Sequence, residues 1–314
     1  MADTTSDTER ETRNSAALAG RTVSRIGYGA MQLERHRGDP EAGVAVLRRA
    51  VELGVDHIDT AHFYGDGFVN GLIRRAAVGD VLVASKVGAA VDPDGPFPMR
   101  AAQRPEELRA EVEKNLQSLG VETIPLVYLR RLEVGPGLAA VGDQIVDIDA
   151  QLAEMTAMRD EGKIGAIGLS AVTIETLRHA VAAGIASVQN PYNVIDRRFE
   201  DALTLSAEND IAWVPFFPLG SSFPGMAKVT DEPVVQNAAA KAGITPSQVG
   251  LAWLLEHSPN LLLIPGTGSV EHLAQNVAVG DIRLDEETRT ALDAIGADTV
   301  AAPIEPPAWP SDAR

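Results

Sequence analysis

The 314-residue sequence predicts an α/β protein, a single-domain (β/α)8 TIM barrel, on three observations. Eight short apolar runs alternate with segments of helical period, as in parallel strands that helices cover on both faces or on the outside of a barrel. No linker, internal repeat or low-complexity block interrupts residues 20–300. Polar or aromatic residues end six of the runs, and the carboxyl ends of barrel strands are where such enzymes build their sites.

The expected strands are runs with few charges, each bounded by segments in which apolar residues recur at helical spacing. They span residues 25–29, 55–59, 81–86, 126–130, 164–170, 186–190, 211–216 and 261–265.

Capping residues mark several of the helices. Pro105 begins a helix that Gly120 ends, because proline suits the first turn and glycine adopts the left-handed conformation after the last turn. Thr245-Pro246-Ser247-Gln248 is a capping box with proline at the first helical position. We expect two extra helices, near residues 231–242 and 285–295, beyond those of the eight strand–helix units.

We expect the barrel to occupy residues 16–300. Residues 1–15 are mostly Thr, Ser, Asp, Glu, Arg and Asn and lack the apolar core of a signal peptide, which indicates a disordered N-terminal tail. Residues 301–314 are rich in proline and predict a C-terminal tail without regular structure.

Composition excludes several classes of function. The formal charge of −17 argues against general affinity for nucleic acid, which requires a basic face. The chain has no cysteine, so it has no disulfides and no thiol nucleophile. No stretch approaches the roughly 18 apolar residues of a membrane span. We expect a cytoplasmic enzyme without a membrane partner, and either a monomer or a homo-oligomer is compatible with the sequence.

Three residues form the main candidate for a catalytic group. Asp59 and Tyr64 lie five residues apart where an apolar run gives way to a loop, and Lys86 ends another apolar run. A neighbouring ammonium favours the phenolate and is expected to lower the pKa of Tyr64 from its usual value near 10. Asp59 would keep Lys86 charged and in place. Together these groups predict a tyrosine that donates a proton.

Less specific interpretations apply to the same residues. A lysine at a strand end is often a surface residue, and a lone tyrosine usually serves in packing. Asp59 and Tyr64 beside Lys86 favour the catalytic interpretation. His57 and His62 flank Asp59, but no further ligands accompany them, so we expect no metal site.

Several segments resemble, in order along the chain, those of the aldo-keto reductase family, over residues 18–297. Asp59, Tyr64 and Lys86 are similar to the family's catalytic Asp-Tyr-Lys set. Residues 23–31 and 162–170 are similar to its first and fifth strands. The Arg130 position and two further segments are similar to a bacterial subgroup of the family that includes a pyridoxal reductase.

The resemblance implies NADPH as the cofactor. Ser170 and Gln189 would hold the nicotinamide carboxamide, and Phe216 would stack on the ring. The residues that the resemblance assigns to cofactor binding are Gly29, Met31, Asp59, Ser170, Gln189, Phe216, Phe217, Pro218, Leu219, Gly220, Ile264, Gly266, Thr267, Gly268, His272, Gln275 and Asn276.

The chain departs from the family pattern at three places. Arg130 stands where a catalytic histidine is usual, and an arginine orients a carbonyl group but exchanges no proton near pH 7. Ala171 replaces an asparagine that contacts the carboxamide. Gly266 and His272 replace a lysine and an arginine that bind the 2′-phosphate. We therefore expect a weaker preference for NADPH over NADH.

The resemblance implies the reduction of an aldehyde or ketone, with Asp59, Tyr64, Lys86 and Arg130 as the catalytic residues. Two other functions stay open: a regulatory subunit that binds the cofactor with little turnover, and a biosynthetic or isomerising enzyme that uses Arg130 for another step. The substrate is expected to be a small carbonyl compound, pyridoxal-like or otherwise cyclic or aromatic. Its expected pocket is formed by Phe63, Tyr64, Arg130 and Phe223.

Overall fold

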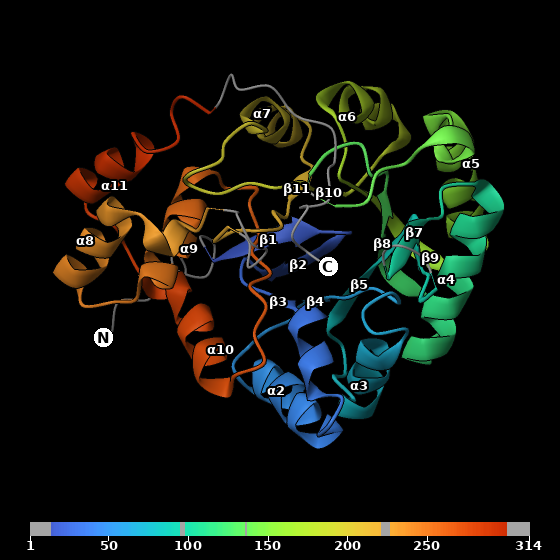
Figure 1. The fold of residues 1–314 in the computed structure, drawn as a ribbon, viewed down its shortest axis with the longest axis horizontal. Helices are drawn as coiled ribbons and strands as arrows, with labels where there is room; N and C mark the ends of the chain where they lie inside the picture. The colour runs from blue at the N-terminus through green and yellow to red at the C-terminus, as the bar shows by residue number, and fades with distance from the viewer. Residues whose placement is uncertain (1–13, 95–97, 136, 221–226, 300–314) are drawn as a thin grey trace, which may run out of the picture.

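Helices surround a curled parallel sheet in the computed structural model, which describes residues 14–94, 98–135, 137–220 and 227–299 (Figure 1). The sheet has seven strands in the order β11-β10-β9-β8-β5-β4-β3. Its strands are β3 (Tyr28–Gly29), β4 (His57–Asp59), β5 (Leu82–Val87), β8 (Ile124–Arg130), β9 (Ile164–Ser170), β10 (Ser187–Gln189) and β11 (Ala212–Trp213).

The eighth expected strand, residues 261–265, does not form a strand. This segment instead makes two isolated parallel bridges, from Leu261 to Trp213 of β11 and from Leu263 to Ile26. The Leu263 amide also donates to the Arg25 carbonyl oxygen at 2.7 Å. The short segment thus links the two edges of the sheet, and the fold is an α/β, TIM-barrel-like one.

Most of the helices follow a strand and cover the outside of the sheet. Their bounds are α2 (Pro40–Glu52), α3 (Phe68–Ala76), α4 (Pro105–Leu119), α5 (Ile148–Asp160), α6 (Ile174–Ala180), α7 (Glu200–Glu208), α8 (Pro233–Ala242), α9 (Pro246–His257), α10 (Val270–Val277) and α11 (Glu286–Asp293). The predicted caps are confirmed, because Gly120 ends α4 with a φ of 71° and Thr245 forms a capping box on α9. Helices α8 and α11 overlap the segments in which extra helices were expected, and Figure 1 shows both beside α9.

A hairpin that the sequence did not predict packs against the interior of the sheet. It consists of β1 (Ser15–Leu18) and β2 (Arg21–Ser24) and lies over the middle of the ring of helices in Figure 1. Its Leu18 and Val23 join a buried cluster with Leu82 and Leu126, which lie near the start of their strands. The folded part therefore includes Ser15, which was expected to belong to the tail, while the rest of both expected tails lies mostly outside the described residues.

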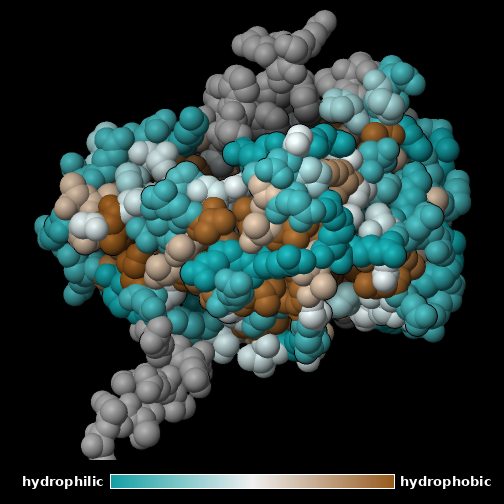
Figure 2. Space-filling model, turned by 90° about the horizontal axis from the view of Figure 1, so that it is seen from below, coloured by the Kyte–Doolittle hydropathy of each residue, from teal (hydrophilic) through white to brown (hydrophobic). Residues whose placement is uncertain are grey.

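The face of the molecule seen in Figure 2 is largely hydrophilic. Figure 2 looks onto the side formed by α2, α3 and α10, where apolar patches are separated by hydrophilic side chains. Within the described ranges, no helix is long and apolar enough to cross a membrane.

Strand alternation places the expected site at one end of the sheet interior. Side chains on a strand alternate between its two faces. Leu82 and Ala84 pack in the interior cluster, so Lys86 has the same orientation. By the same alternation, Arg130 of β8 follows Leu126 and Tyr128 of that cluster. Because alternate residues of each strand point to the same face, polar residues of separate strands come together at the carboxyl ends of the strands.

The backbone after α3 generates a stability prediction. Ala77 is exposed and has a φ of 52°, a left-handed conformation that suits glycine. Ala77→Gly should raise the free energy of unfolding by about 0.5–1 kcal/mol, measured by chemical denaturation. Ala45→Gly, at an exposed position inside α2, is the matched control and should lower it by a similar amount. Equal effects of the two substitutions would contradict this account.

Candidate active site

A buried ion pair forms the centre of the site. The Lys86 ammonium donates to Asp59 Oδ1, to the Thr60 carbonyl oxygen at 3.1 Å and to the Tyr64 hydroxyl at 3.1 Å. The Lys86 and Asp59 side chains are only 8% and 6% exposed. All three donors of the ammonium are thus used, and one of them is directed at the phenol oxygen.

A network of hydrogen bonds between buried polar side chains fixes the segments that carry this ion pair. The Thr60 hydroxyl donates to Asn70 Oδ1 at 2.8 Å, and Asn70 donates to Asn115 Oδ1 at 3.0 Å. Ser85, next to Lys86, also donates to Asn115 Oδ1, at 2.6 Å. All four side chains are fully buried. Strand β5, α3 and α4 are therefore tied to the loop that contains Thr60.

The net pKa shift of Tyr64 differs from the expected one. Burial raises the pKa of the phenol above its usual value of 10, and the nearby Lys86 ammonium lowers it by less. The expected net lowering was therefore wrong, although the direction of the Lys86 contribution agrees with it. For Lys86, burial is the largest single effect and lowers the pKa, but the Asp59 carboxylate and the Tyr64 hydroxyl together raise it overall. At neutral pH the site holds a protonated phenol beside a charged ammonium.

Arg130 is a second cation in the same cavity. It ends β8, is half-buried, and its guanidinium makes no hydrogen bond or ion pair with any described residue. Burial lowers its pKa from a high usual value, and Tyr64 opposes that shift, so the group stays charged at neutral pH.

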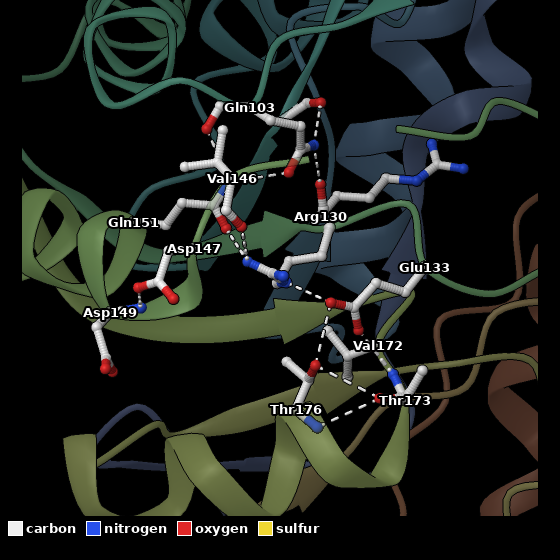
Figure 3. A network of polar contacts seen from close by, with 12 residues as sticks. Gln103, Arg130, Glu133, Val146, Asp147, Asp149, Gln151, Val172, Thr173 and Thr176 are labelled. Carbon is white, nitrogen blue, oxygen red and sulfur yellow. Dashed lines mark hydrogen bonds and ion pairs between the residues drawn. The ribbon is translucent and has the colours of Figure 1, made fainter. Parts of the chain in front are cut away.

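The neighbouring Arg131 has a different environment. It donates to Glu133 Oε1 at 2.6 Å, to the Val146 carbonyl oxygen at 3.1 Å and to Gln151. Figure 3 shows this network on one side of the β8 end and the Arg130 side chain extending away from it. Arg131 is a structural residue, and Arg130 is free to contact a ligand.

One cavity of about 1450 Å³ joins the expected site residues. It exceeds the 300–1000 Å³ of typical small-molecule pockets, so a cofactor and a substrate can share it. It is lined by all of the expected catalytic residues, by Phe63, and by the expected cofactor residues except Gly268. An ideal Cβ at Gly268 would lie 2.8 Å from Arg35 Cδ, so Gly268 packs against the segment after β3 instead. Phe223 lies outside the described residues.

The cavity contains an unused buried acceptor. Gln189 donates to Asp59 Oδ2 at 2.7 Å, while its Oε1 atom is buried and has no partner among the described residues. Ser170 of the neighbouring strand is also buried and lines the cavity. A carboxamide that both donates and accepts hydrogen bonds fits this pair. These residues are therefore suited to the nicotinamide end of a dinucleotide.

Close contact between two chain segments forms another part of the cavity wall, beside Asp59. An ideal Cβ at Gly29 would lie 2.5 Å from the Ile264 carbonyl oxygen, and one at Gly266 would lie 2.8 Å from the Gly29 carbonyl oxygen. Both glycines are therefore required by close backbone approach. Gly266, Thr267 and Asn276 line the cavity beside this contact.

Several cavity residues were not foreseen from the sequence. Val91 and Met99 belong to a hairpin of β6 (Ala89–Val91) and β7 (Met99–Ala101), and they line the cavity near Phe63. The turn residues Asp92-Pro93-Asp94 after an apolar run were the available signal. Arg35 also lines the cavity, and nothing in the sequence pattern pointed to it.

Strained backbone surrounds the site. Four non-glycine residues with φ between 54° and 60° lie in segments that follow β4, β8, β9 and β11, and they are Asp66, Leu132, Ala171 and Phe217. Each such conformation costs roughly 1–2 kcal/mol in an L-residue. Asparagine tolerates this region better than alanine. Compared with the asparagine that the family pattern has here, Ala171 lacks the side-chain amide and is less suited to this backbone conformation.

The buried ion pair generates a second prediction. Asp59→Asn should lower the free energy of unfolding by about 3–5 kcal/mol, because the Lys86 charge would stay buried without its counterion. Asp59 raises the pKa of Lys86 above its usual value of 10.5. The stabilisation is therefore complete below that value and is lost as the pH rises through the higher folded-state pKa.

Denaturation of parent and variant from pH 6 to 11 checks this prediction. The difference should be largest near pH 6 and should shrink as the pH rises, because buried Lys86 has a lowered pKa in the variant and loses its proton more easily there. Asp80→Asn is the control, since Asp80 pairs with Arg21 at the surface and should change stability little. An Asp59→Asn protein as stable as the control would show that the pair does not stabilise the fold.

Comparisons with known proteins identify the family of the chain. The model of the aldo/keto reductase family matches residues 25–297. Pyridoxine 4-dehydrogenase of Escherichia coli (strain K12) is 39% identical over 291 residues, which cover 90% of this chain and 98% of that protein. An uncharacterized oxidoreductase of Schizosaccharomyces pombe is 33% identical over 282 residues and covers 87% of each chain.

Solved structures give the same result. An aldo-keto reductase from Klebsiella pneumoniae in complex with NADPH has a TM-score of 0.74 at 25% identity, covering 90% of this chain and 95% of that one. Glycerol dehydrogenase from Gluconobacter oxydans has a TM-score of 0.76 at 23% identity, covering 94% and 98%, and this likeness concerns the fold alone. With a family match over most of its length and the relative from Escherichia coli at 39% identity, the chain belongs to the aldo/keto reductase family.

Proposed function

We propose that this protein is an NADPH-dependent reductase of aldehydes, with a pyridoxal-like or other aromatic hydroxyaldehyde as its substrate. One observation carries the proposal. The Lys86 ammonium donates at 3.1 Å to the hydroxyl of Tyr64, inside a cavity that also contains the unpaired guanidinium of Arg130. A proton donor, the cation that stabilises its anion, and a cation for the carbonyl oxygen are thus together.

NADPH fits the other residues of the cavity. Ser170 and the free Oε1 atom of Gln189 would hold the carboxamide, and Phe216, which lines the same cavity, would stack on the ring. The segment 218–220 and the residues Gly266 to Asn276 that line the cavity would hold the phosphates and the adenosine. Solved relatives that bind NADPH support this assignment. When bound, NADPH supplies a hydride.

Tyr64 is the proton donor of the reaction. Its raised pKa keeps the phenol protonated at neutral pH, as an acid requires. The carbonyl carbon accepts the hydride, the carbonyl oxygen takes the Tyr64 proton, and the products are an alcohol and a phenolate. Lys86, kept charged by Asp59, stabilises that phenolate through the hydrogen bond that it already donates.

Arg130 polarises the carbonyl oxygen and selects the substrate. Its guanidinium presents several donors in one plane and binds two neighbouring oxygens at once. A hydroxyl group next to the aldehyde, as in pyridoxal, would supply the second oxygen. Phe63, Val91 and Met99 form an apolar wall for an aromatic ring. The name of the relative from Escherichia coli, pyridoxine 4-dehydrogenase, supports this substrate class.

Tyr64→Phe tests the assignment of the acid. The variant should lose nearly all reduction of pyridoxal and of 2-hydroxybenzaldehyde, because phenylalanine lacks the hydroxyl proton that the proposed mechanism transfers. Its dissociation constant for NADPH, measured by fluorescence, should stay within a few fold of the parent value. A variant that keeps most of the parent kcat would exclude Tyr64 as the donor.

Arg130→Met tests the role of the second cation. Its kcat/KM for 2-hydroxybenzaldehyde should fall by roughly 10²–10³-fold, the effect of removing one oxyanion donor, and its kcat/KM for 3-hydroxybenzaldehyde should fall less. Arg130→His should keep part of the activity and introduce a dependence on pH near 6–8. Arg21→Met, a substitution of a surface arginine, should match the parent. Equal losses for both aldehydes would remove the proposed substrate selection.

A further inference from the structure

One buried glutamine connects the two strand ends that carry the catalytic cations. Gln103 lies just before α4 and is only 1% exposed. Its side-chain amide donates to the Gly88 carbonyl oxygen at 2.6 Å and to the Arg130 carbonyl oxygen at 2.7 Å. Gly88 comes two residues after Lys86, so a single amide group joins the backbones on which both cations depend.

This contact stands where the pairing of the two strands ends. Strands β5 and β8 pair up to Val87 and Leu129, so the next rung would join Gly88 and Arg130. Gly88 instead has a φ of 103°, outside the strand conformation, and an ideal Cβ on it would clash with the Arg130 carbonyl oxygen and lie 2.9 Å from Gln103 Nε2. The Gln103 amide therefore replaces the missing rung, because its two hydrogens reach one carbonyl oxygen on each strand.

Gln103 itself is held from the opposite side. Fully buried Gln151 donates to Gln103 Oε1 at 3.0 Å and to the Gln103 carbonyl oxygen at 2.7 Å. Gln151 in turn accepts from Arg131, which continues to Glu133 and the start of α6 (Figure 3). Both donors and the acceptor of the Gln103 amide are satisfied, so its orientation is uniquely defined.

We propose that Gln103 is a positioning residue for Arg130, an inference that rests on the proposed function. The Arg130 guanidinium makes no hydrogen bond to a described residue, so its location depends on where its backbone is anchored. Arg130 also lowers the pKa of Tyr64. Gln103 thereby sets the distance between this cation and the acid, and errors on the order of 1 Å in such distances cost about 100-fold in rate.

Gln103→Met, which removes both donors at similar size, tests the proposal in two backgrounds. In the parent it should lower kcat/KM for the aldehyde by roughly 10–100-fold and change NADPH affinity by less than about twofold. With Arg130→Met already present, it should lower kcat/KM by less than about threefold, since coupled residues are not additive. Equal factors in both backgrounds would overturn the proposal.

A second readout does not require turnover. The chain has four tyrosines, so NMR of 13C-labelled tyrosine, assigned with Tyr64→Phe, follows the Tyr64 pKa. Gln103→Met should raise this pKa, and it should have no effect in Arg130→Met. An unchanged pKa would overturn the positioning role. If Gln103→Met raises the Tyr64 pKa but the parent protein has no reductase activity, the proposed function is rejected and the positioning role of Gln103 is kept.

Two controls separate positioning from stability. Gln236→Met is the same substitution on α8, where the exposed glutamine donates to the Thr230 carbonyl oxygen at 3.2 Å, and it should behave as the parent. Gln103→Asn keeps the buried amide but is too short to reach both carbonyl oxygens. It should repeat the kinetic coupling even where Gln103→Met fails to fold, and additivity in this variant would also overturn the proposal.

Discussion

In the mechanism that we propose, the buried ion pair of Lys86 and Asp59 controls the chemistry of the site. Burial of the lysine alone would favour its neutral form, and the Asp59 carboxylate and the Tyr64 hydroxyl together reverse that preference. The ammonium then contacts the Tyr64 hydroxyl and partly offsets the effect of burial on the pKa of the phenol. Because the effect of burial is larger, the phenol stays protonated at neutral pH. In the proposed mechanism it donates that proton, and the nearby ammonium then stabilises the phenolate.

Precise placement of these groups comes from buried polar side chains outside the cavity. The Thr60, Asn70, Ser85 and Asn115 cluster anchors the ion pair, and Gln103 anchors the strand end that carries Arg130. Such fully satisfied networks are rigid, while a partly satisfied one is costly. Four residues that follow strands of the sheet have strained backbone conformations. Such conformations persist only where packing and hydrogen bonds of the surrounding fold offset their cost.

Local patterns in the sequence were sufficient to predict much of this structure. Segments of seven of the eight expected strands form the parallel sheet, and the caps at Gly120 and Thr245 are confirmed, because apolar runs and capping residues act over a few positions. The segment at 261–265 failed as a strand, since its pairing depends on both sheet edges. The contacts of Gln103 and the net pKa of Tyr64 could not be predicted from the sequence. Each depends on burial and on residues that are distant in the sequence.

Deuterium transfer to pyridoxal, from NADPH that carries deuterium in place of both hydrogens on the reactive carbon of the nicotinamide ring, shows whether this site reduces aldehydes by hydride transfer. The product alcohol is analysed by mass spectrometry after a single turnover, at pH 7, for the parent protein and for Tyr64→Phe. The account predicts one deuterium on the former aldehyde carbon with the parent and almost none with the variant. A parent protein that binds labelled NADPH but transfers no deuterium to any aromatic aldehyde would contradict it.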